Sequence, residues 1–311
     1  MKLLPLVSIV MPAYNHEKFV SEAIDSVLNQ TWENLELIII DDGSTDSTPD
    51  IVKAYDDSRV QYFHQHNQDA YNALNAGLAK TKGEYVGIIN SDDVFHPARI
   101  ERLIDRMIEQ QSAAIFSEVS PIDDDSAAIT NPEFGWLQWH KNNRDFFLQQ
   151  PDDVYRGFLK GNLMVTTSNL LMTAEAKNTV GKFAPYRYLH DYDYIFRLLN
   201  AFENRVHYAH DEALMNYRIH SGNTISQAAI IGREQDQEII RNAVLRQVPS
   251  AQQERVNVGI DRLVQLEQEL HGVRMQLKPA FANDAQNIAN IPTASLAKTL
   301  LKRLAAKLSG K

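Results

Sequence analysis

Two pairs of adjacent aspartates follow apolar runs in the first third of the chain. In "LELIIIDDGSTDS" a run rich in isoleucine leads directly into Asp41 and Asp42, and in "GEYVGIINSDDVFHP" a second run leads into Asp92 and Asp93. β-Branched residues are typical of covered strands, so each pair is predicted to stand at the carboxyl end of a strand. Carboxylates crowded at one sheet edge repel one another unless a cation or a donor-rich ligand joins them. Oxygen ligands of this kind suit Mg²⁺ or Mn²⁺, which usually bridge to substrate phosphates, so the pattern indicates a nucleotide diphosphate.

The first pair also has a purely structural interpretation. Gly43 accepts backbone angles that other residues avoid, and Ser47 or Thr48 would cap a helix ahead of Pro49. On this stretch alone the two interpretations are equally supported. The second acidic pair, predicted at the same sheet edge, favours a ligand.

The elements that must position these carboxylates alternate between strands and helices. Strands are predicted at residues 7–11, 35–40, 60–64 and 85–89, and helices at residues 17–29, 48–55, 70–80 and 97–110. Such alternation implies parallel pairing with right-handed crossovers, and therefore an open α/β sheet that binds ligands beyond the carboxyl ends of its strands. A further strand is predicted at residues 113–119. The next segment, "EFGWLQWHKNNRDFF", is predicted to be a polar loop, and regular structure returns at residues 165–172, at a helix near Asp191 and in "RVHYAHDEALMNYRIH".

Composition narrows the class of protein. The 311 residues are 44% hydrophobic and 23% charged, as in ordinary globular proteins. The net charge of −9 argues against nonspecific binding of nucleic acid by the whole molecule. Without cysteine there is no disulfide and no thiolate chemistry, which fits a cytoplasmic location. Prolines at positions 5 and 12 interrupt the apolar start, so we interpret it as the first strand and not as a signal peptide.

From about residue 226 onward the composition shifts to Gln, Glu, Arg and Ala with helical spacing. This shift places a predicted domain boundary between residues 225 and 226. Residues 256–277 carry an a/d-like apolar stripe, which would serve a homodimer or would pack on the chain's own domain. The end, "SLAKTLLKRLAAKLSGK", is a basic amphipathic helix by pattern. It would lie peripherally on the inner face of an anionic membrane, or dock onto the catalytic domain or a partner.

Several motifs together resemble the inverting family-2 glycosyltransferases of the GT-A fold. They are "VSIVMPAYNHEKFVSEAIDSVLNQTWENLELIIIDDGSTDST", "NALNAGLAKTKGEYVGIINSDDVFHPARI", "YLHDYDYIFRLL" and "YRIHSGNTIS", and they cover residues 7–225. The resemblance implies a Rossmann-like mixed, mostly parallel sheet that binds a nucleotide-diphospho-sugar, with residues 226–311 as a helical extension. It further implies transfer of a hexosyl or N-acetylhexosaminyl group, with UDP as the expected nucleotide.

The resemblance also implies donor-binding roles. Asp42 would accept a hydrogen bond from the nucleobase imide, because an ionised carboxylate can only accept. Pro12, Ala13 and Tyr14 would form the adjacent wall of the pocket, and Ser91 would contact the donor. The remaining donor candidates are Asn72, Asn75 and Arg218. The two asparagines would contact the donor sugar or simply lie on a helix surface, and the arginine would pair with phosphate.

The same resemblance supplies a metal site and a base. "NSDD" matches the metal-binding DXD motif, with Asp92 and Asp93 as ligands of Mn²⁺ or Mg²⁺ and His220 as a further ligand or a contact to the diphosphate. Asn90 replaces the first acidic position, which predicts weaker metal affinity without nucleotide. Asp191 becomes the catalytic base, although the residue pattern alone favours a helix N-cap. His190 stands where the family usually has Glu.

Other functions fit the sequence less well. A nucleotidyltransferase would need a glycine-rich basic loop after the first strand, and a processive synthase would need membrane spans and a Gln-x-x-Arg-Trp motif. We therefore expect transfer of single sugars from a UDP-linked donor to a glycan or lipid-linked acceptor. The alternative is a catalytically inactive module that keeps the fold and binds nucleotide. Trp136 and Trp139 would either stack on an acceptor sugar or pack within the protein.

Overall fold

The computed structural model describes residues 4–220, 238–239, 241–243, 245, 248–250, 252–254 and 256–259. The chain divides into two units, Met1–Ala243 and Val244–Lys311. The predicted domain boundary at residues 225/226 lies outside the described residues. So do nearly all of the predicted 256–277 stripe and the whole basic tail, so the dimer and membrane hypotheses stay predictions. Among the described residues, no helix is long and apolar enough to cross a bilayer.

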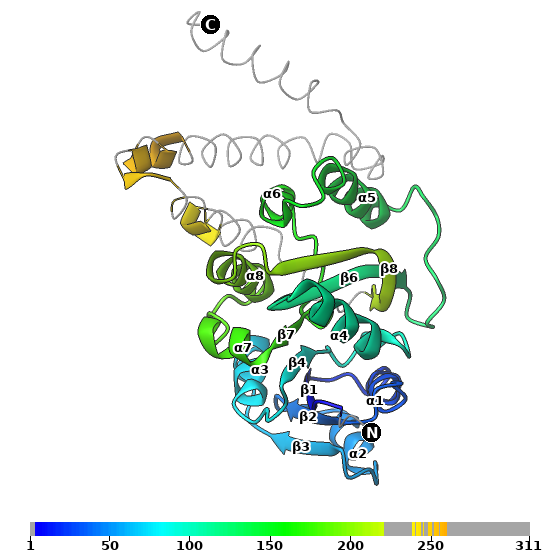
Figure 1. The fold of residues 1–311 in the computed structure, drawn as a ribbon. Helices are drawn as coiled ribbons and strands as arrows, with labels where there is room; N and C mark the ends of the chain where they lie inside the picture. The colour runs from blue at the N-terminus through cyan, green and yellow to red at the C-terminus, as the bar shows by residue number, and fades with distance from the viewer. Residues whose placement is uncertain are drawn as a thin grey trace, which may run out of the picture. The chain divides into compact units, whose positions relative to one another are not determined.

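The first unit is a mixed α/β structure built on one eight-stranded sheet (Figure 1). Its strands are β1 (Val7–Ala13), β2 (Leu35–Asp41), β3 (Val60–His64), β4 (Tyr85–Ile88), β5 (Val94–Phe95), β6 (Ala114–Ile122), β7 (Leu171–Thr173) and β8 (Val206–Arg218). Its helices are α1 (Val20–Leu28), α2 (Thr48–Lys53), α3 (Ala70–Leu78), α4 (Arg99–Gln110), α5 (Gly135–Phe147), α6 (Val154–Lys160), α7 (Ala174–Val180) and α8 (His190–Ala201), with a 3-10 turn, η1 (Thr167–Asn169). The strand order is β3-β2-β1-β4-β7-β6-β8-β5.

Four strands form the parallel half of the sheet, as the alternation of strands and helices predicts. β1 lies between β2 and β4 and pairs with both in parallel, and β3 pairs in parallel with β2. β1 and β2 are almost wholly buried, because helices cover both faces of a parallel sheet. The carboxyl ends of these strands therefore meet at one edge, where Ala13 lies opposite Asp41.

The other half of the sheet is mixed. β7 runs antiparallel to both β4 and β6, whereas β8 runs parallel to β6 along nearly the whole of that strand. The short β5, which follows the second acidic pair, pairs antiparallel with β8. This mixed, mostly parallel sheet confirms the predicted fold class.

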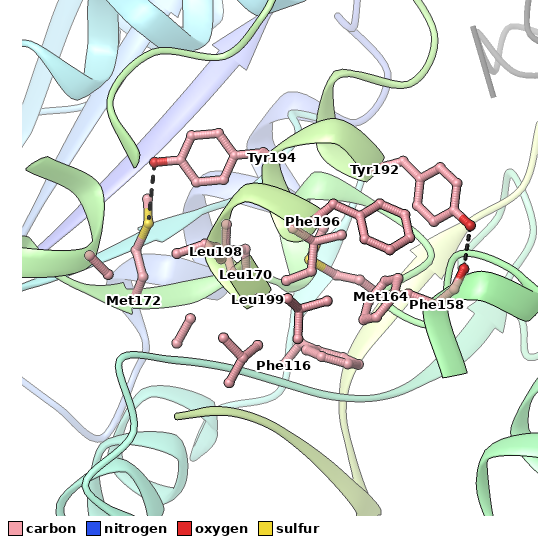
Figure 2. Packing of buried hydrophobic residues seen from close by; sticks show 14 of the residues in the cluster. Phe116, Phe158, Met164, Leu170, Met172, Tyr192, Tyr194, Phe196, Leu198 and Leu199 are labelled. Atoms are coloured by element: carbon pink, nitrogen blue, oxygen red, sulfur yellow. Dashed lines mark hydrogen bonds between the residues drawn. The ribbon is translucent and has the colours of Figure 1, made fainter. Parts of the chain in front are cut away.

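α8 is held by a dense aromatic and aliphatic core (Figure 2). The Tyr194 hydroxyl donates to the Met172 sulfur at 3.6 Å, and the Tyr192 hydroxyl donates to the Phe158 carbonyl. The other labelled members of the core are Phe116, Met164, Leu170, Phe196, Leu198 and Leu199. Because this face of the helix is buried, the first turn of α8, which carries Asp191, has a fixed position.

The predicted elements differ from the structure in two places. Residues 135–147, predicted as loop, form α5, a helix of 13 residues. Its buried positions are His140, Asn143 and Phe147. Because two of these residues are polar, the sequence shows no apolar periodicity from which a helix could be predicted. Only the last two residues of the predicted segment 165–172 belong to a strand, β7 (Leu171–Thr173), since η1 and its flanking loop occupy the rest.

Candidate active site

The first acidic pair lies at the carboxyl end of β2, where its two members have different environments. Asp41 is fully buried and accepts hydrogen bonds from the Ser44 amide (2.9 Å) and the Tyr62 hydroxyl (2.7 Å), with His64 Nδ1 at 3.0 Å. Burial alone would raise its pKa, but these hydrogen bonds outweigh burial and lower the pKa of Asp41. Gly43 has φ +81°, and a Cβ there would come within 2.9 Å of a backbone nitrogen, so the turn requires glycine. Asp41 is thus a structural residue of this turn.

Asp42 is the member of the pair that lies beside the end of β1. Its amide donates to the Ala13 carbonyl at 2.8 Å, and its Oδ1 accepts from Gln65 Nε2 (2.7 Å) and from the Gln68 amide (3.0 Å). Both side-chain bonds use the same carboxylate oxygen. Burial raises the pKa of Asp42. The structure therefore places Asp42 beside Ala13 at the end of β1, where Pro12 precedes it and Tyr14, which is 45% exposed, follows it.

The N-cap position of α2 is Ser47, one of the two residues predicted to cap this helix. The Ser47 side chain makes no capping hydrogen bond to the helix. Instead, Asp46 Oδ1 accepts a hydrogen bond from the Thr48 amide at 3.0 Å. The Thr48 hydroxyl accepts from the amide of His16 at 2.9 Å. This loop therefore fixes the backbone at His16, a residue that sequence reasoning did not single out.

The second acidic pair also divides. Asp92 is buried, and its Oδ2 lies 3.0 Å from His220 Nε2. Burial would raise the pKa of Asp92, but the hydrogen bond from His220 and the charges of His16 and His220 outweigh it and lower the pKa. His16 and His220 lie edge to face, with ring centroids 5.9 Å apart, and His16 Nδ1 is 2.8 Å from Ser91 Oγ.

Asp93 points to a different set of partners. Its Oδ2 accepts from the hydroxyls of Ser168 (2.5 Å) and Thr166 (3.3 Å), and its Oδ1 accepts from the Arg218 amide (3.0 Å). Burial and the neighbouring Asp92 charge raise the pKa of Asp93 to about 8. This geometry favours a structural role for Asp93 over the predicted ligand role. Each acidic pair thus has its own set of hydrogen-bond partners. Within the part of the chain that the structure describes, no hydrogen bond joins one pair to the other.

His16, Asp92 and His220 form a group that fits a divalent metal ion. One ligand atom from each lies within 4.8 Å of the other two, a spacing that a shared ion requires. Ser91 engages Nδ1 of His16, as an outer partner does in many histidine metal sites, and leaves Nε2 for an ion. Two imidazoles and one carboxylate suit Mn²⁺ or another transition ion better than Mg²⁺.

Asp191 lies in the first turn of α8 and is 7% exposed. Its Oδ2 accepts from Asn162 Nδ2 at 2.9 Å and its Oδ1 from the Tyr192 amide at 2.8 Å. The N-cap position belongs to Leu189, so Asp191 is not the cap of this helix. Burial raises the pKa of Asp191, against the opposing effects of His190 and of both hydrogen bonds. A buried carboxylate with a raised pKa is typical of a general base.

His190 faces the loop before β7. Its Nε2 lies 3.2 Å from the Thr167 hydroxyl and its Nδ1 lies 3.3 Å from the Tyr186 carbonyl. Burial lowers the pKa of His190, although the Asp191 charge opposes the change. Through its contact with Thr167, the imidazole ties the first turn of α8 to the loop before β7.

The remaining residues predicted to bind the sugar donor make hydrogen bonds to other residues of the chain. Arg218 is fully buried: its guanidinium donates to the Asp92 and Asp123 carbonyls, to Ser126 Oγ and to Glu22 Oε2. Asn75 exchanges two hydrogen bonds with the backbone of Phe183, and Asn72 Nδ2 donates to the Gln68 carbonyl. These contacts favour structural roles for all three residues.

Comparison with known proteins identifies the family of the chain. Residues 8–162 match the family described as Glycosyl transferase family 2. An uncharacterized glycosyltransferase of Rickettsia typhi is 31% identical over 229 residues, which are 72% of this chain and 67% of the relative. GlyG, a glycosyltransferase of Streptococcus pneumoniae, is 37% identical over 122 residues, which are 38% of this chain and 40% of that protein. The chain belongs to the family-2 glycosyltransferases.

Solved structures show the same fold. The TarS fragment of S. aureus in complex with UDP-GlcNAc has a TM-score of 0.56 and 18% identity, over 76% of this chain and 65% of that one. The UDP complex of the same fragment gives a TM-score of 0.54 at 17% identity, over 76% of this chain and 64% of that one. This chain therefore spans less than two thirds of the TarS fragments, and at such identity the likeness concerns the fold alone.

Proposed function

We propose that the chain is an inverting glycosyltransferase that moves a sugar from a UDP-linked donor to a hydroxyl group of a glycan or a lipid-linked acceptor. The observation that carries the proposal is the environment of Asp191. A buried carboxylate, held by Asn162 in the first turn of a firmly packed helix, has the position and the raised pKa that a catalytic base needs.

On the donor side, we assign the nucleobase to the pocket formed by Pro12, Ala13, Tyr14 and Asp42. Because both side-chain hydrogen bonds of Asp42 use Oδ1, we assign Oδ2 as the acceptor for the imide N–H of uracil. The UDP and UDP-GlcNAc complexes of TarS, which has the same fold, support UDP and a hexosyl or N-acetylhexosaminyl group.

His16, Asp92 and His220 would hold a divalent cation, Mn²⁺ in preference to Mg²⁺. When bound, such an ion stabilises negative charge on the departing diphosphate. Asn90 donates to the Thr166 hydroxyl at 3.0 Å and Asp93 bonds elsewhere, so only one carboxylate belongs to this group. This supports the expectation that the ion binds weakly until a nucleotide adds its own oxygens.

Asp191 would take the proton from the acceptor hydroxyl as that oxygen attacks the anomeric carbon from the face opposite the diphosphate. The new C–O bond forms while the bond to the diphosphate oxygen breaks, so a single displacement inverts the anomeric centre. General-base catalysis of this type contributes about 10² to 10⁴ in rate. The alternative function is a catalytically inactive module of the same fold that binds nucleotide.

The test combines nucleotide binding with turnover. We expect calorimetric titration with UDP, GDP and dTDP to show binding of UDP that requires Mn²⁺ and is lost in Asp92→Ala. Asp191→Asn should bind UDP like the wild type but lose hydrolysis of UDP-sugar donors. Equal hydrolysis by Asp191→Asn and the wild type would favour the inactive module, and no binding of any nucleotide would contradict the whole proposal.

A further inference from the structure

α5 carries a cluster of aromatic rings that the donor site does not use. Trp136, Trp139 and His140 have the i, i+3, i+4 spacing that places side chains on one helix face. Trp136 stacks on His140 (centroids 5.0 Å apart, rings at 20°) and on Tyr217 of β8 (5.6 Å, 23°). Trp139 contacts the cluster only at a tilt, at 52° to Trp136 and 39° to His140, and is 40% exposed. Trp139 is therefore the ring of this cluster that is open to a ligand.

The base of the cluster is held rigidly. Glu118 stands where the pairing of β6 with β8 changes register, an irregularity of the kind that re-aims side chains. Its Oε1 lies 2.5 Å from His140 Nε2, and its Oε2 accepts from Tyr208 (2.9 Å) and pairs with Arg144 Nε (2.8 Å). These contacts fix His140, and His140 in turn supports Trp136. Trp139 lies against this anchored ring, with ring centroids 6.2 Å apart, so its surroundings are already ordered before a ligand binds, which favours affinity.

The cluster also adjoins the proposed catalytic centre. Tyr217, the ring beneath Trp136, directly precedes Arg218, whose amide donates to Asp93 and whose Nε donates to the Asp92 carbonyl. Burial raises the pKa of Tyr217, and the charges of Asp93, Asp92 and Asp191 raise it further. The rings therefore connect the exposed face of α5 with the end of β8, where the backbone bonds to the acidic motif.

We propose that Trp139 is the platform of an acceptor subsite, and that the acceptor is a carbohydrate whose pyranose ring stacks on the exposed indole. The inference rests on the proposed function and adds the chemical class of the acceptor to it. The C–H face of a pyranose complements the negative face of an aromatic ring. Asn142, exposed and three residues after Trp139, supplies an amide for the sugar hydroxyls.

The surroundings favour a sugar over an acyl chain. The positions of α5 three and four residues after Trp139 are Asn142 and Asn143, so polar side chains follow the indole on its own helix face. An acyl chain would require a larger continuous apolar patch. A pyranose matches both the single apolar face and the polar residues beside it.

The experiment uses the full chain with UDP and Mn²⁺ present, on an array of bacterial surface oligosaccharides read with labelled protein. The variants are Trp139→Ala, Trp139→Phe and, as a control at the C-cap of the same helix, Leu148→Ala, a residue that is 37% exposed. We expect the wild type and Leu148→Ala to bind the same glycans. Trp139→Ala should lose about tenfold or more in affinity, as on truncating a central aromatic contact, and Trp139→Phe should keep most of the binding.

The proposal is overturned if Trp139→Ala binds the same glycans as strongly as the wild type, or if the wild type binds none of them. Calorimetric titration with UDP separates this failure from a failure of the proposed function. Unchanged UDP binding in every variant means that only the acceptor inference has failed. Absence of UDP binding in the wild type means that the donor proposal itself has failed.

Discussion

Asn162 donates a hydrogen bond to Oδ2 of Asp191 at 2.9 Å, across 29 residues of sequence. The same loop supplies Thr166 and Ser168 to Asp93, so one short segment contacts both the proposed base and the acidic motif. Within it, Val165 has φ 71°, an unfavourable backbone conformation for a β-branched residue. Such strain persists only where the surroundings hold the residue in place, and it is concentrated at functional sites.

The first prediction concerns the pH dependence of transfer. Burial raises the pKa of Asp191, and a base acts only when it is ionised, so activity should fall as the pH drops through that raised value. The bond from Asn162 stabilises the ionised form. Asn162→Ala should therefore move the acid limb of kcat/KM to higher pH by about one unit.

Asp105→Asn is the control for this experiment, because Asp105 is an exposed carboxylate on α4. It should leave the acid limb where it is in the wild type. If Asn162→Ala leaves the acid limb unchanged while Asp191→Asn abolishes activity, the proposed influence of Asn162 on the base is wrong.

The second prediction concerns metal binding. His16→Ala removes one of three potential ligands and should weaken Mn²⁺ binding, measured by electron paramagnetic resonance with UDP present. The loss should be at least the roughly tenfold typical of removing an outer hydrogen-bond partner of a metal ligand. His66→Ala, which changes an exposed histidine outside this group, should bind Mn²⁺ like the wild type. Unchanged affinity in His16→Ala, with loss in Asp92→Ala, would remove His16 from the site.

The third prediction distinguishes a structural Arg218 from a phosphate ligand. Its guanidinium is fully buried and bonded to Glu22 and to two carbonyl groups, so Arg218→Ala leaves a cavity and unpaired polar groups. We expect the free energy of unfolding to fall by about 3 kcal/mol or more, measured by urea denaturation. Arg102→Ala, which breaks an exposed ion pair with Glu212, should cost about 1 kcal/mol or less. Normal stability of Arg218→Ala combined with lost UDP affinity would support the phosphate role instead.

The fourth prediction tests how closely α3 lies on the sheet. A Cβ at Gly77 would come within 2.3 Å of Val10 Cγ1, so Gly77→Ala should lower the free energy of unfolding by about 1 to 3 kcal/mol despite the better helix propensity of alanine. Gly135→Ala is the matched change, because nothing lies within 4 Å of a Cβ at that first position of α5. It should be neutral or slightly stabilising. Equal stability of the two variants would contradict the close approach.

The parallel half of the fold could be predicted because its strands are nearly continuous apolar runs. Burial on both faces imposes this composition on β1 and β2, and the aspartates that end β2 stand out against it. α5 could not be predicted in this way, because it buries His140 and Asn143 beside Phe147. Polar residues at core positions remove the apolar period on which helix prediction depends.

The proximity of His16 to His220 is likewise invisible in the sequence. The two residues are 204 positions apart, and they meet because the loop after β1 and the end of β8 reach the same edge of the sheet. Local spacing indicates which carboxylates follow strands. It does not indicate that Asp92 lies with two histidines while Asp93 bonds to Ser168.

The chain leaves the sheet after β6 and re-enters it at β7, and α5 and α6 both lie within this excursion (Figure 1). The residues proposed for the nucleobase, by contrast, come from the ends of β1 and β2. A chimera that exchanges only the excursion between relatives would then inherit its acceptor preference from one parent and its nucleotide preference from the other. Selection can accordingly diversify the products of such an enzyme without rebuilding the half of the fold that binds the nucleotide.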